Sequence, residues 1–570
     1  MFLLSLSNLI EHTLIKILTK YVIRLIGISA ELFLAFFITL IMYITFNAEI
    51  HPPLVSEVNI GKRVKVGKDH YVLGPNYLRK NEFGVWEMYI EGDAYERGLV
   101  YGELSKELLQ KQEEIFVKQI DQFVPSEFWQ QFLRLLLGFF NSDLPAYIPL
   151  ENQQEIYGIS QSFSDEYDYI ASKYTRILNY HAAHDIGHAL NDYSMVGCTS
   201  FALKDEMTAE GDLTIGRNFD FYVGDDFAKE KLVLFVNPTK GHSFVSYSWA
   251  GFTGVASGMN DQGLSVTINA SKSDLPTGTK EPISLLAREI LQYASTIDEA
   301  VAIAKKRHTF VSETLMIGSA KDGKAVLIEK SPTKTGVYDS KASTLVCANH
   351  YQSATFKNDP VNVKNIQDSD SKFRYARVNE LLNKKKGLTV ENVLSILRDQ
   401  LATANDTLGM GNPRAINQLI AHHSVIMQPE RNLFYVSTGN FQLGEFVGYD
   451  LKKTFATKKA VVSNQLAASP FVYSNEYKDF LAFKKVKHQI TEFLLFDKAL
   501  NLSDADVKKF IAYNSESYVT YEVLGKYFMK KGNNTKAKEM FNRALTKNLA
   551  SKNTRIELED LVKECSTTKK

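Results

Sequence analysis

The sequence of 570 residues predicts an α+β fold in which outer helices cover two packed sheets, between an N-terminal apolar helix and a C-terminal helical region. Three observations support this prediction. Segments of strand type, then helices, then further strand segments follow one another between residues 198 and 437. A stretch with a single charge occupies residues 25–46. Small and aromatic residues fall at helical spacing in residues 521–544.

The composition excludes several classes of protein. The chain carries 66 Lys and Arg against 65 Asp and Glu, so no basic field exists to attract nucleic acid. The length is sufficient for two or three domains, and an aromatic content of 12% supplies a large core. The three cysteines, Cys198, Cys347 and Cys565, are too few for a disulfide framework and contain no Cys-x-x-Cys pair that would indicate zinc.

Residues 1–50 predict a membrane anchor. Three basic residues precede the apolar stretch 25–46, which only Glu31 interrupts with a charge. The stretch is long enough to span a bilayer if Glu31 lies near the interface. The basic side should stay in the cytoplasm, so the rest of the chain is expected on the extracytoplasmic side, which is the periplasm in a Gram-negative bacterium. A cleaved signal peptide and secretion are the alternative, although residues 46–48 are a poor cleavage site.

The body of the chain is expected to begin after a linker at His51, Pro52 and Pro53, because consecutive prolines cannot extend a helix. Residues 103–121 have apolar residues on one helical side, and residues 126–190 are mostly of helical type. A first group of strands is then expected at 198–203, 213–222, 232–237, 243–249, 254–257 and 264–269.

A second group of elements completes the body. Two helices are expected at 281–293 and 297–307, and the first has Pro282 in its first turn. Further strands are expected at 314–319, 325–329 and 345–348, helices at 371–383 and 389–403, and final strands at 425–428 and 433–437. This order fits two packed sheets with helices outside.

Residues 471–570 predict a separate helical region. Its small and aromatic residues have the spacing of a tetratricopeptide-like helical hairpin, at Tyr521, Leu524, Gly525, Phe528, Ala537, Phe541 and Ala544. A single repeat cannot bury its apolar face alone, so the hairpin is expected to dock on the rest of the chain. Binding of a protein partner and a purely structural hairpin are both open at this point.

The segment around Cys198 carries the candidate chemistry. A nucleophilic cysteine needs a base, a charge that holds it in place and donors for an oxyanion. If the chain is cut between Gly197 and Cys198, the new α-amine has a pKa of about 8, which suits it to take the thiol proton near neutral pH. Arg217 and Asp220 follow shortly downstream.

Four motifs in order give the sequence a resemblance to a known family. They are residues 90–98 with Tyr101-Gly102, the pair Gly197-Cys198-Thr199 and Arg217-Asn218-x-Asp220, residues 258–264 with Ile268-Asn269, and Cys347-Ala348-Asn349-His350. Between about residues 88 and 440, the sequence resembles the N-terminal-nucleophile (Ntn) hydrolases. The closest branch is acyl-CoA:6-aminopenicillanic acid acyltransferase (peptidase family C45), and choloylglycine hydrolases and acid-ceramidase-like enzymes are more distant.

The resemblance implies a four-layer αββα sandwich over residues 51–470, with self-cleavage between Gly197 and Cys198. It implies that Cys198 is the nucleophile, with its own α-amine as base. It further implies that Arg217 and Asp220 orient the amine, that Asn269 donates to the oxyanion and that Asn349 binds the substrate amide or the amine. For the arginine that choloylglycine hydrolases use late in the chain, Arg374 and Arg431 are both open.

The implied enzyme is an amidohydrolase or acyltransferase that forms an acyl-enzyme from a linear amide, without a cofactor or metal. The sequence does not distinguish hydrolysis from acyl transfer. A membrane anchor favours a lipid-like or other small-molecule amide as substrate.

Two alternatives belong to other classes of protein. One is an inactive Ntn fold that serves as a membrane-tethered scaffold through the C-terminal helices. The other is a metal hydrolase that uses His181, His184 and His188, which lie on one helical face. Asp185 is the only evident additional ligand there. His422 and His423 are expected to be structural, whereas His350, which follows Asn349, could enter the pocket but is not expected to act as a base.

Overall fold

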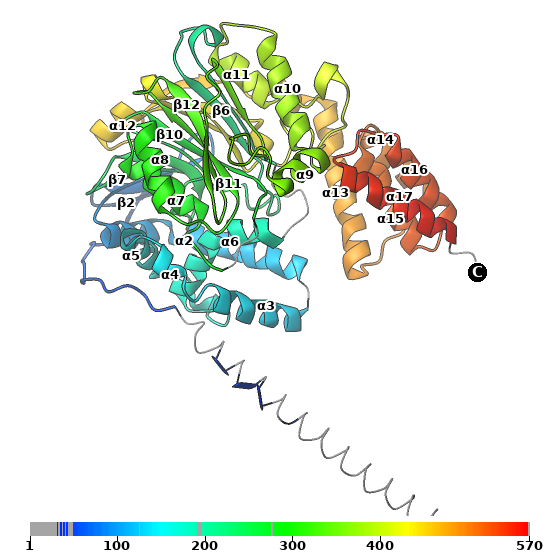
Figure 1. Ribbon diagram of the computed structural model, residues 1–570. Helices are drawn as coiled ribbons and strands as arrows, with labels where there is room; N and C mark the ends of the chain where they lie inside the picture. The colour runs from blue at the N-terminus through cyan, green and yellow to red at the C-terminus, as the bar shows by residue number, and fades with distance from the viewer. Residues whose placement is uncertain are drawn as a thin grey trace, which may run out of the picture.

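The computed structural model describes residues 50–124, 126–190, 197–274 and 278–567, together with scattered positions between 31 and 43. In this part of the chain, two large sheets lie face to face with helices on their outer sides (Figure 1). The C-terminal helices, orange to red in Figure 1, form a separate group beside this sandwich. The predicted α+β class is confirmed.

The first sheet has eleven strands within the described residues, in the order β1-β2-β3-β4-β7-β8-β9-β10-β11-β12-β13. The pair β4 and β7 is parallel, and the other neighbours are antiparallel. The bounds are β1 Val64–Gly67, β2 His70–Leu73, β3 Asn76–Lys80, β4 Trp86–Gly92, β7 Lys231–Pro238, β8 Phe244–Trp249, β9 Ser257–Asn260, β10 Leu264–Ala270, β11 Glu313–Ser319, β12 Lys324–Lys330 and β13 Thr335–Tyr338.

The second sheet has seven antiparallel strands within the described residues, in the order β14-β5-β6-β15-β16-β17-β18. The bounds are β5 Thr199–Leu203, β6 Thr214–Phe219, β14 Thr344–Cys347, β15 His423–Gln428, β16 Leu433–Ser437, β17 Phe446–Asp450 and β18 Val462–Leu466. Cys198 directly precedes β5, which lies between β14 and β6.

Helices cover the outer face of each sheet. Those before the second sheet are α2 Ala94–Phe123, α3 Glu127–Phe140, α4 Leu144–Tyr147, α5 Leu150–Ser160 and α6 Lys173–Leu190. Those within the body are α7 Ile283–Tyr293, α8 Ile297–Lys306, α9 Pro360–Asp368, α10 Ser371–Asn383, α11 Val390–Leu397 and α12 Leu451–Thr457. Those at the C-terminus are α13 Asn475–Phe496, α14 Asp504–Tyr513, α15 Tyr518–Lys530, α16 Asn534–Leu545 and α17 Lys552–Thr567.

Three buried apolar cores define the layers of the body. One joins α2, α5, α6, α7 and α8 to the eleven-stranded sheet, as in the contacts of Leu104 and Leu286 with its outer face. A second lies between the sheets and contains Phe235 and Val425. A third joins the seven-stranded sheet to α10 and α11, including Val378 and Leu397. The layers therefore run helix, sheet, sheet, helix.

The sequence prediction missed several strands and misjudged one helix. Strands β1 to β4 lie ahead of the predicted strand region, and β13, β17 and β18 were also missed. The predicted helix 389–403 ends at Leu397, because the carbonyl of Leu397 accepts from the side chains of Asn218 and Gln442 instead of a later backbone N–H. The motif residues Asn260–Gly263 form the turn that joins β9 to β10, with Gly263 in the left-handed region at φ +73°.

The C-terminal helices have a core of their own. Gly525 of α15 lies under the ring of Phe541 of α16, where a Cβ would approach ring atoms within 2.4 Å. Small residues thus allow these two helices to pack closely, as expected for a helical hairpin. The assignment of this pair as tetratricopeptide-like stays a prediction.

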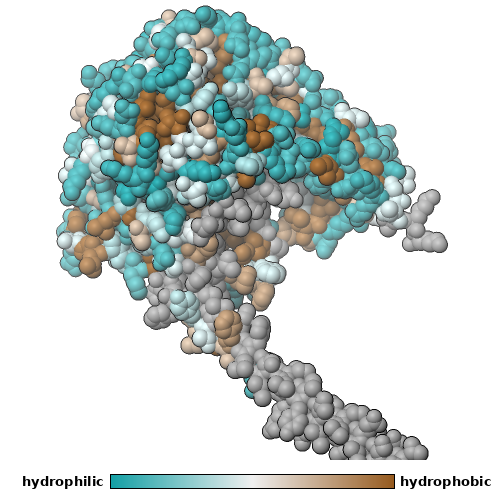
Figure 2. All heavy atoms as spheres, in the orientation of Figure 1, coloured by the Kyte–Doolittle hydropathy of each residue, from teal (hydrophilic) through white to brown (hydrophobic). Residues whose placement is uncertain are grey.

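Most of residues 1–50, on which the anchor prediction rests, lie outside the described residues. Among the residues that are described, no helix combines the length and apolar character needed to cross a bilayer. On the face shown in Figure 2, hydrophobic residues occur in separate patches on a largely hydrophilic surface.

The first family motif serves the packing of two helices. Gly98 of α2 meets α5 so closely that a Cβ would lie 2.1 Å from the carbonyl oxygen of Glu155. Next to it, the buried Arg97 pairs with Glu155 at 2.6 Å, and Arg288 of α7 pairs with the same carboxylate at 2.7 Å. This buried ion cluster links three helices over the eleven-stranded sheet.

We predict that Gly98→Ala lowers the free energy of unfolding by about 1–3 kcal/mol, because the added methyl group overpacks the contact between α2 and α5. Urea denaturation would measure the change. Gly278→Ala is the matched control, since a Cβ there meets no atom within 4 Å. Equal stability of the two variants would contradict this account of the motif.

Candidate functional site

Cys198 is sealed inside the uncut chain. Its side chain is 1% exposed, and its peptide continues directly into β5. Burial raises the pKa of the Cys198 thiol to about 11, although the nearby Arg217 acts in the opposite direction. The thiol is therefore protonated near neutral pH and is a weak nucleophile in this state.

Arg217 of β6 reaches the sulfur of Cys198. The register of β5 and β6 sets Ser200 opposite Arg217, and Nη2 of the arginine lies 3.6 Å from Sγ. The guanidinium is fully buried and also donates to the carbonyl of Ala256 at 3.0 Å. The carbonyl of Ile268 accepts a further hydrogen bond. Arg217 thus joins the seven-stranded sheet to the eleven-stranded sheet at the sulfur.

Three polar side chains, those of Ser257, His423 and His422, form a series of contacts that begins at Arg217. The hydroxyl of Ser257 accepts from Nη1 of Arg217 and contacts Nε2 of His423 at 2.9 Å. Nδ1 of His423 lies 2.9 Å from Nδ1 of His422. Burial lowers the pKa of both imidazoles well below the usual range, so they are neutral. Their structural role agrees with the expectation from sequence.

Asp220 lies one residue beyond β6 and is fully buried. Burial raises the pKa of its carboxyl to about 7. Its Oδ2 atom accepts from Nε2 of Gln418 at 3.3 Å, and its main-chain carbonyl accepts from the N–H of Gly197 at 3.1 Å. Its Oδ1 atom has no hydrogen-bond partner among the described residues.

The two predicted asparagines are bound to the main chain. Asn269 accepts from Ser200 at 2.8 Å, and its Nδ2 atom lies 3.5 Å and 3.4 Å from the carbonyl oxygens of Cys347 and Ala348. Asn349 donates to the carbonyl of Ala270 at 2.9 Å. The long contacts of Asn269 cost little to break, so its amide can turn to another acceptor.

Arg374 of α10 contacts the peptide of Cys198. Its Nη1 atom donates to the Cys198 carbonyl at 2.7 Å, and its Nη2 atom donates to Oδ1 of Asn349 at 2.7 Å. Arg431, the other arginine left open by the sequence, pairs instead with Asp212 at 2.8 Å at an exposed position. The structure thus brings Arg374, and not Arg431, to Cys198.

Gln418 was missed by the sequence analysis. Its Nε2 atom donates to the carbonyl of Gly197 at 2.6 Å, and its side chain is buried. No local pattern marks Gln418, which lies in an irregular segment 221 residues away from Gly197.

Of the candidate metal ligands, the structure describes the side chains of His181 and Asp185. Both ring nitrogens of His181 are engaged, by the carbonyl of Ile177 at 2.8 Å and by Thr253 at 2.9 Å. Asp185 accepts from the N–H of Ile283 at 3.0 Å. The side chains of His184 and His188 lie outside the described residues, and no group of three potential ligands occurs among those that are described.

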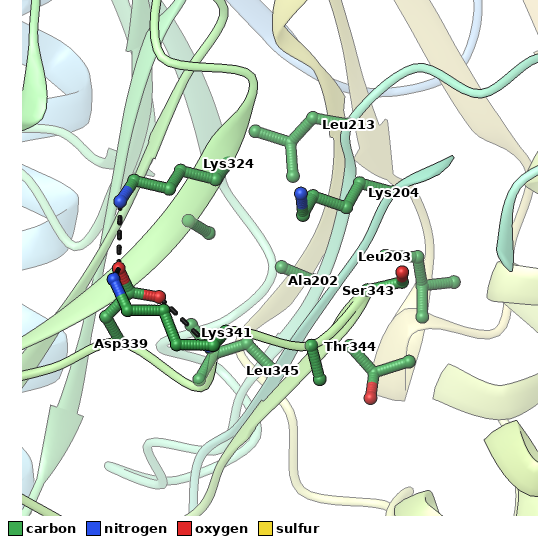
Figure 3. Close-up of a pocket in the computed structure, with 12 residues that line it drawn as sticks. Ala202, Leu203, Lys204, Leu213, Lys324, Asp339, Lys341, Ser343, Thr344 and Leu345 are labelled. Atoms are coloured by element: carbon green, nitrogen blue, oxygen red, sulfur yellow. Dashed lines mark hydrogen bonds and ion pairs between the residues drawn. The ribbon is translucent and has the colours of Figure 1, made fainter. Parts of the chain in front are cut away.

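A cavity of about 160 Å³ lies at the other end of the strand that Cys198 precedes. Its wall includes Leu203, the last residue of β5, and Leu345 of β14. At its rim, Asp339 binds both Lys324 at 2.8 Å and Lys341 at 2.6 Å (Figure 3). Because β5 separates the cavity from Cys198, this cavity is not part of the candidate site.

Comparisons with known proteins identify relatives of this chain. The family model of Acyl-coenzyme A:6-aminopenicillanic acid acyl-transferase matches residues 207–407, which include Arg217, Asp220, Asn269, Asn349 and Arg374. An uncharacterized protein of Archaeoglobus fulgidus is 27% identical over 309 residues, which are 47% of this chain and 50% of the relative.

Two further relatives come from Caenorhabditis elegans. An N-acylethanolamine-hydrolyzing acid amidase is 25% identical over 202 residues, which are 33% of this chain and 54% of the relative. The solved structure of an N-acylethanolamine-hydrolyzing acid amidase ortholog has 18% identity and a TM-score of 0.31, covering 41% of this chain and 93% of its own. The chain spans about half the length of the curated relatives it matches.

We predict that Arg374→Met lowers the free energy of unfolding by about 3 kcal/mol or more, because it leaves several buried acceptors without a donor. The control Arg431→Met removes an exposed ion pair and should change it by less than about 1 kcal/mol. Urea denaturation of both variants provides the measurement. A loss of equal size at the two positions would mean that Arg374 has no special place in the site.

Apart from the uncharacterized protein, the matched family model and the curated amidase carry names that describe acyl transfer or amide hydrolysis. The resemblance of this chain to the Ntn hydrolases of the acyl-CoA:6-aminopenicillanic acid acyltransferase type is therefore confirmed.

Proposed function

We propose that this chain is the precursor of a cysteine-nucleophile amide hydrolase or acyltransferase that cuts itself between Gly197 and Cys198. The observation that carries the proposal is that several contacts fix the residues on either side of the bond between Gly197 and Cys198. Arg217 holds the sulfur of Cys198, Arg374 holds the Cys198 carbonyl, and Asp220 accepts from the N–H of Gly197. Two buried guanidinium groups and the main-chain carbonyl of Asp220 thus hold the two residues on either side of this bond.

Cleavage supplies what the uncut site lacks. A thiol with a pKa of about 11 needs a base, and the cut creates an α-amine on the same residue, with a pKa of about 8. The amine also provides a donor for the Oδ1 atom of Asp220, which has none among the described residues. Removal of the preceding peptide exposes the sulfur to substrate.

The mature enzyme then follows nucleophilic catalysis. The thiol of Cys198 attacks the amide carbonyl of the substrate while the α-amine takes the thiol proton. Asn269 turns its Nδ2 atom to the developing oxyanion, and Asn349 binds the substrate amide or the amine. The protonated amine returns the proton to the leaving amine, and a thioester remains on Cys198. Water completes hydrolysis, whereas a second amine completes transfer.

The substrate class follows from what the relatives share. Their names describe transfer of an acyl group to an amine and hydrolysis of an N-acyl amide. A linear acyl amide, small or lipid-like, fits both reactions. The predicted N-terminal anchor would place such an enzyme at a membrane surface, and the C-terminal helices are available to a protein partner.

We predict that the purified chain consists of two fragments that meet at Gly197 and Cys198, and that Cys198→Ala stays full length. The α-amine of the second fragment is required for turnover, so cleavage and activity should appear together. Intact-mass spectrometry measures the fragments, and thiol alkylation of the cut enzyme should abolish activity. An uncut chain with full activity would overturn the proposal.

We predict that the first-order rate of self-cleavage rises about tenfold per pH unit between about pH 7.5 and 9.5, because the thiolate fraction of Cys198 increases in that range. Arg217, Asp220, Glu313 and Arg374 are the charged groups that act on this thiol, and Asp220 is already ionised above its pKa of about 7. Mature turnover should instead level off near about pH 8, at the pKa of the α-amine. Cleavage independent of pH would contradict this.

A further inference from the structure

We infer that Gln418 is a catalytic residue of the maturation cut, in which its side-chain amide donates to the oxyanion formed on the Gly197 carbonyl. The inference rests on the proposed self-cleavage. It concerns a residue that lies beyond the matched family region, which ends at residue 407. It also assigns a donor to the maturation cut that is separate from the donor for substrate turnover.

The side-chain amide of Gln418 lies within hydrogen-bond distance of the Gly197 carbonyl, which is the group that reacts. Its Nε2 atom is 2.6 Å from the oxygen of Gly197, which is the carbonyl that Cys198 must attack. A second contact, 3.3 Å to Oδ2 of Asp220, keeps the amide oriented with its nitrogen toward Gly197. The side chain is 2% exposed, so the hydrogen bond is not exchanged with bulk water.

The residue at the cut is a glycine for a steric reason. A Cβ at position 197 would lie 2.2 Å from Nε2 and 2.7 Å from Oε1 of Gln418. Gly197 has no left-handed backbone conformation that would itself require glycine. The absence of a side chain at this position therefore leaves room for the Gln418 amide beside the Gly197 carbonyl.

Hydrogen bonds of the neighbouring residues fix the main chain on both sides of Gln418. The N–H of Asn417 donates to the carbonyl of Asp399 at 2.9 Å, and the carbonyl of Ile416 accepts from Asn218 of β6 at 3.0 Å. The next residue, Leu419, is in the left-handed region at φ +54° and donates its N–H to Oδ1 of Asn417 at 3.0 Å. Gln418 is thus preorganised, as a donor for an oxyanion must be.

The chemical step is an acyl shift followed by hydrolysis. The sulfur of Cys198 forms a bond to the carbonyl carbon of Gly197, and the carbonyl oxygen becomes the oxyanion that Gln418 binds. The C–N bond then breaks and the nitrogen takes the thiol proton, which gives a thioester and a free α-amine. Water attacks the thioester through a second oxyanion at the same oxygen, releasing the Gly197 carboxylic acid and the thiol. One water is consumed.

Gln418 should not be needed once the cut is complete. The carbonyl that it binds leaves with the first fragment, whereas the substrate oxyanion is assigned to Asn269. An amide is suited to the task because it donates a hydrogen bond without carrying a charge, next to the buried carboxyl group of Asp220. Loss of the donor should therefore slow maturation far more than it slows the turnover of each mature molecule.

The test follows the full-length chain by intact-mass spectrometry over time. Gln418→Ala should slow the first-order cleavage by about a hundred- to a thousandfold, the usual effect of removing one oxyanion donor. Gln418→Glu, which keeps the shape but presents a carboxylate, should be at least as slow. After prolonged incubation, turnover per cut molecule should fall far less than the rate of cleavage, because Gln418 reaches the mature site through its contact with Asp220.

Gln442 provides a matched control. It is also fully buried, and its Nε2 atom donates to the carbonyl of Leu397 at 2.7 Å, in place of Gly197. Gln442→Ala should cut at the wild-type rate. A folded Gln418→Ala that cuts as fast as the wild type overturns the inference, and Gln418→Glu decides if the alanine variant does not fold. Failure of the wild type itself to cut would instead overturn the proposed function.

Discussion

Two fully buried arginines, Arg217 and Arg374, hold the chain around Cys198, and the site depends on both. A buried guanidinium is stable only when its N–H groups meet acceptors, because its desolvation is costly. Arg217 finds the carbonyl of Ala256 across the gap between the sheets, whereas Arg374 joins the Cys198 carbonyl to Asn349. The two sheets and α10 must therefore be assembled before the nucleophile is fixed. A site built in this way is a late product of folding and not a local property of β5.

The same dependence extends to the C-terminal helices. The segment between Leu408 and Gln418 runs from these helices to the cleavage site. At one end, Asn412 donates to the carbonyl of Asn548 at 2.8 Å. One residue further on, Pro413 accepts from Nε of Arg374 at 3.1 Å. The helical region therefore supports the segment that carries Arg374's acceptor and Gln418, so its packing and the geometry of the site are coupled.

The sequence predicted those strands and site residues that a pattern within a short stretch of chain marks. Many strands after residue 198, such as β7, are apolar runs that are buried along most of their length, whereas β1 is exposed along its whole length and carries no such signal. Cys198, Arg217 and Asp220 were predicted because they lie close together in the chain within family motifs, and the antiparallel pair β5 and β6 brings them together in the fold. Arg374 and Gln418 lie 176 and 221 residues from their partners, so only the packing of α10 and an irregular segment places them. No periodicity could have selected Arg374 over Arg431 or indicated Gln418.

The electrostatics of the uncut site explain why an uncharged donor suits position 418. Burial already lowers the pKa of Arg217 and raises that of Asp220 to about 7, so each further buried charge would add to the desolvation cost. A lysine at 418 would add another buried cation to a site that already holds Arg217 and Arg374 at Cys198, and a glutamate would repel Asp220. The amide of Gln418 avoids both. The cut then adds a single ammonium group, and in our proposal the Oδ1 atom of Asp220 receives it. In this proposal, Asp220 pairs with the ammonium group that cleavage creates on Cys198.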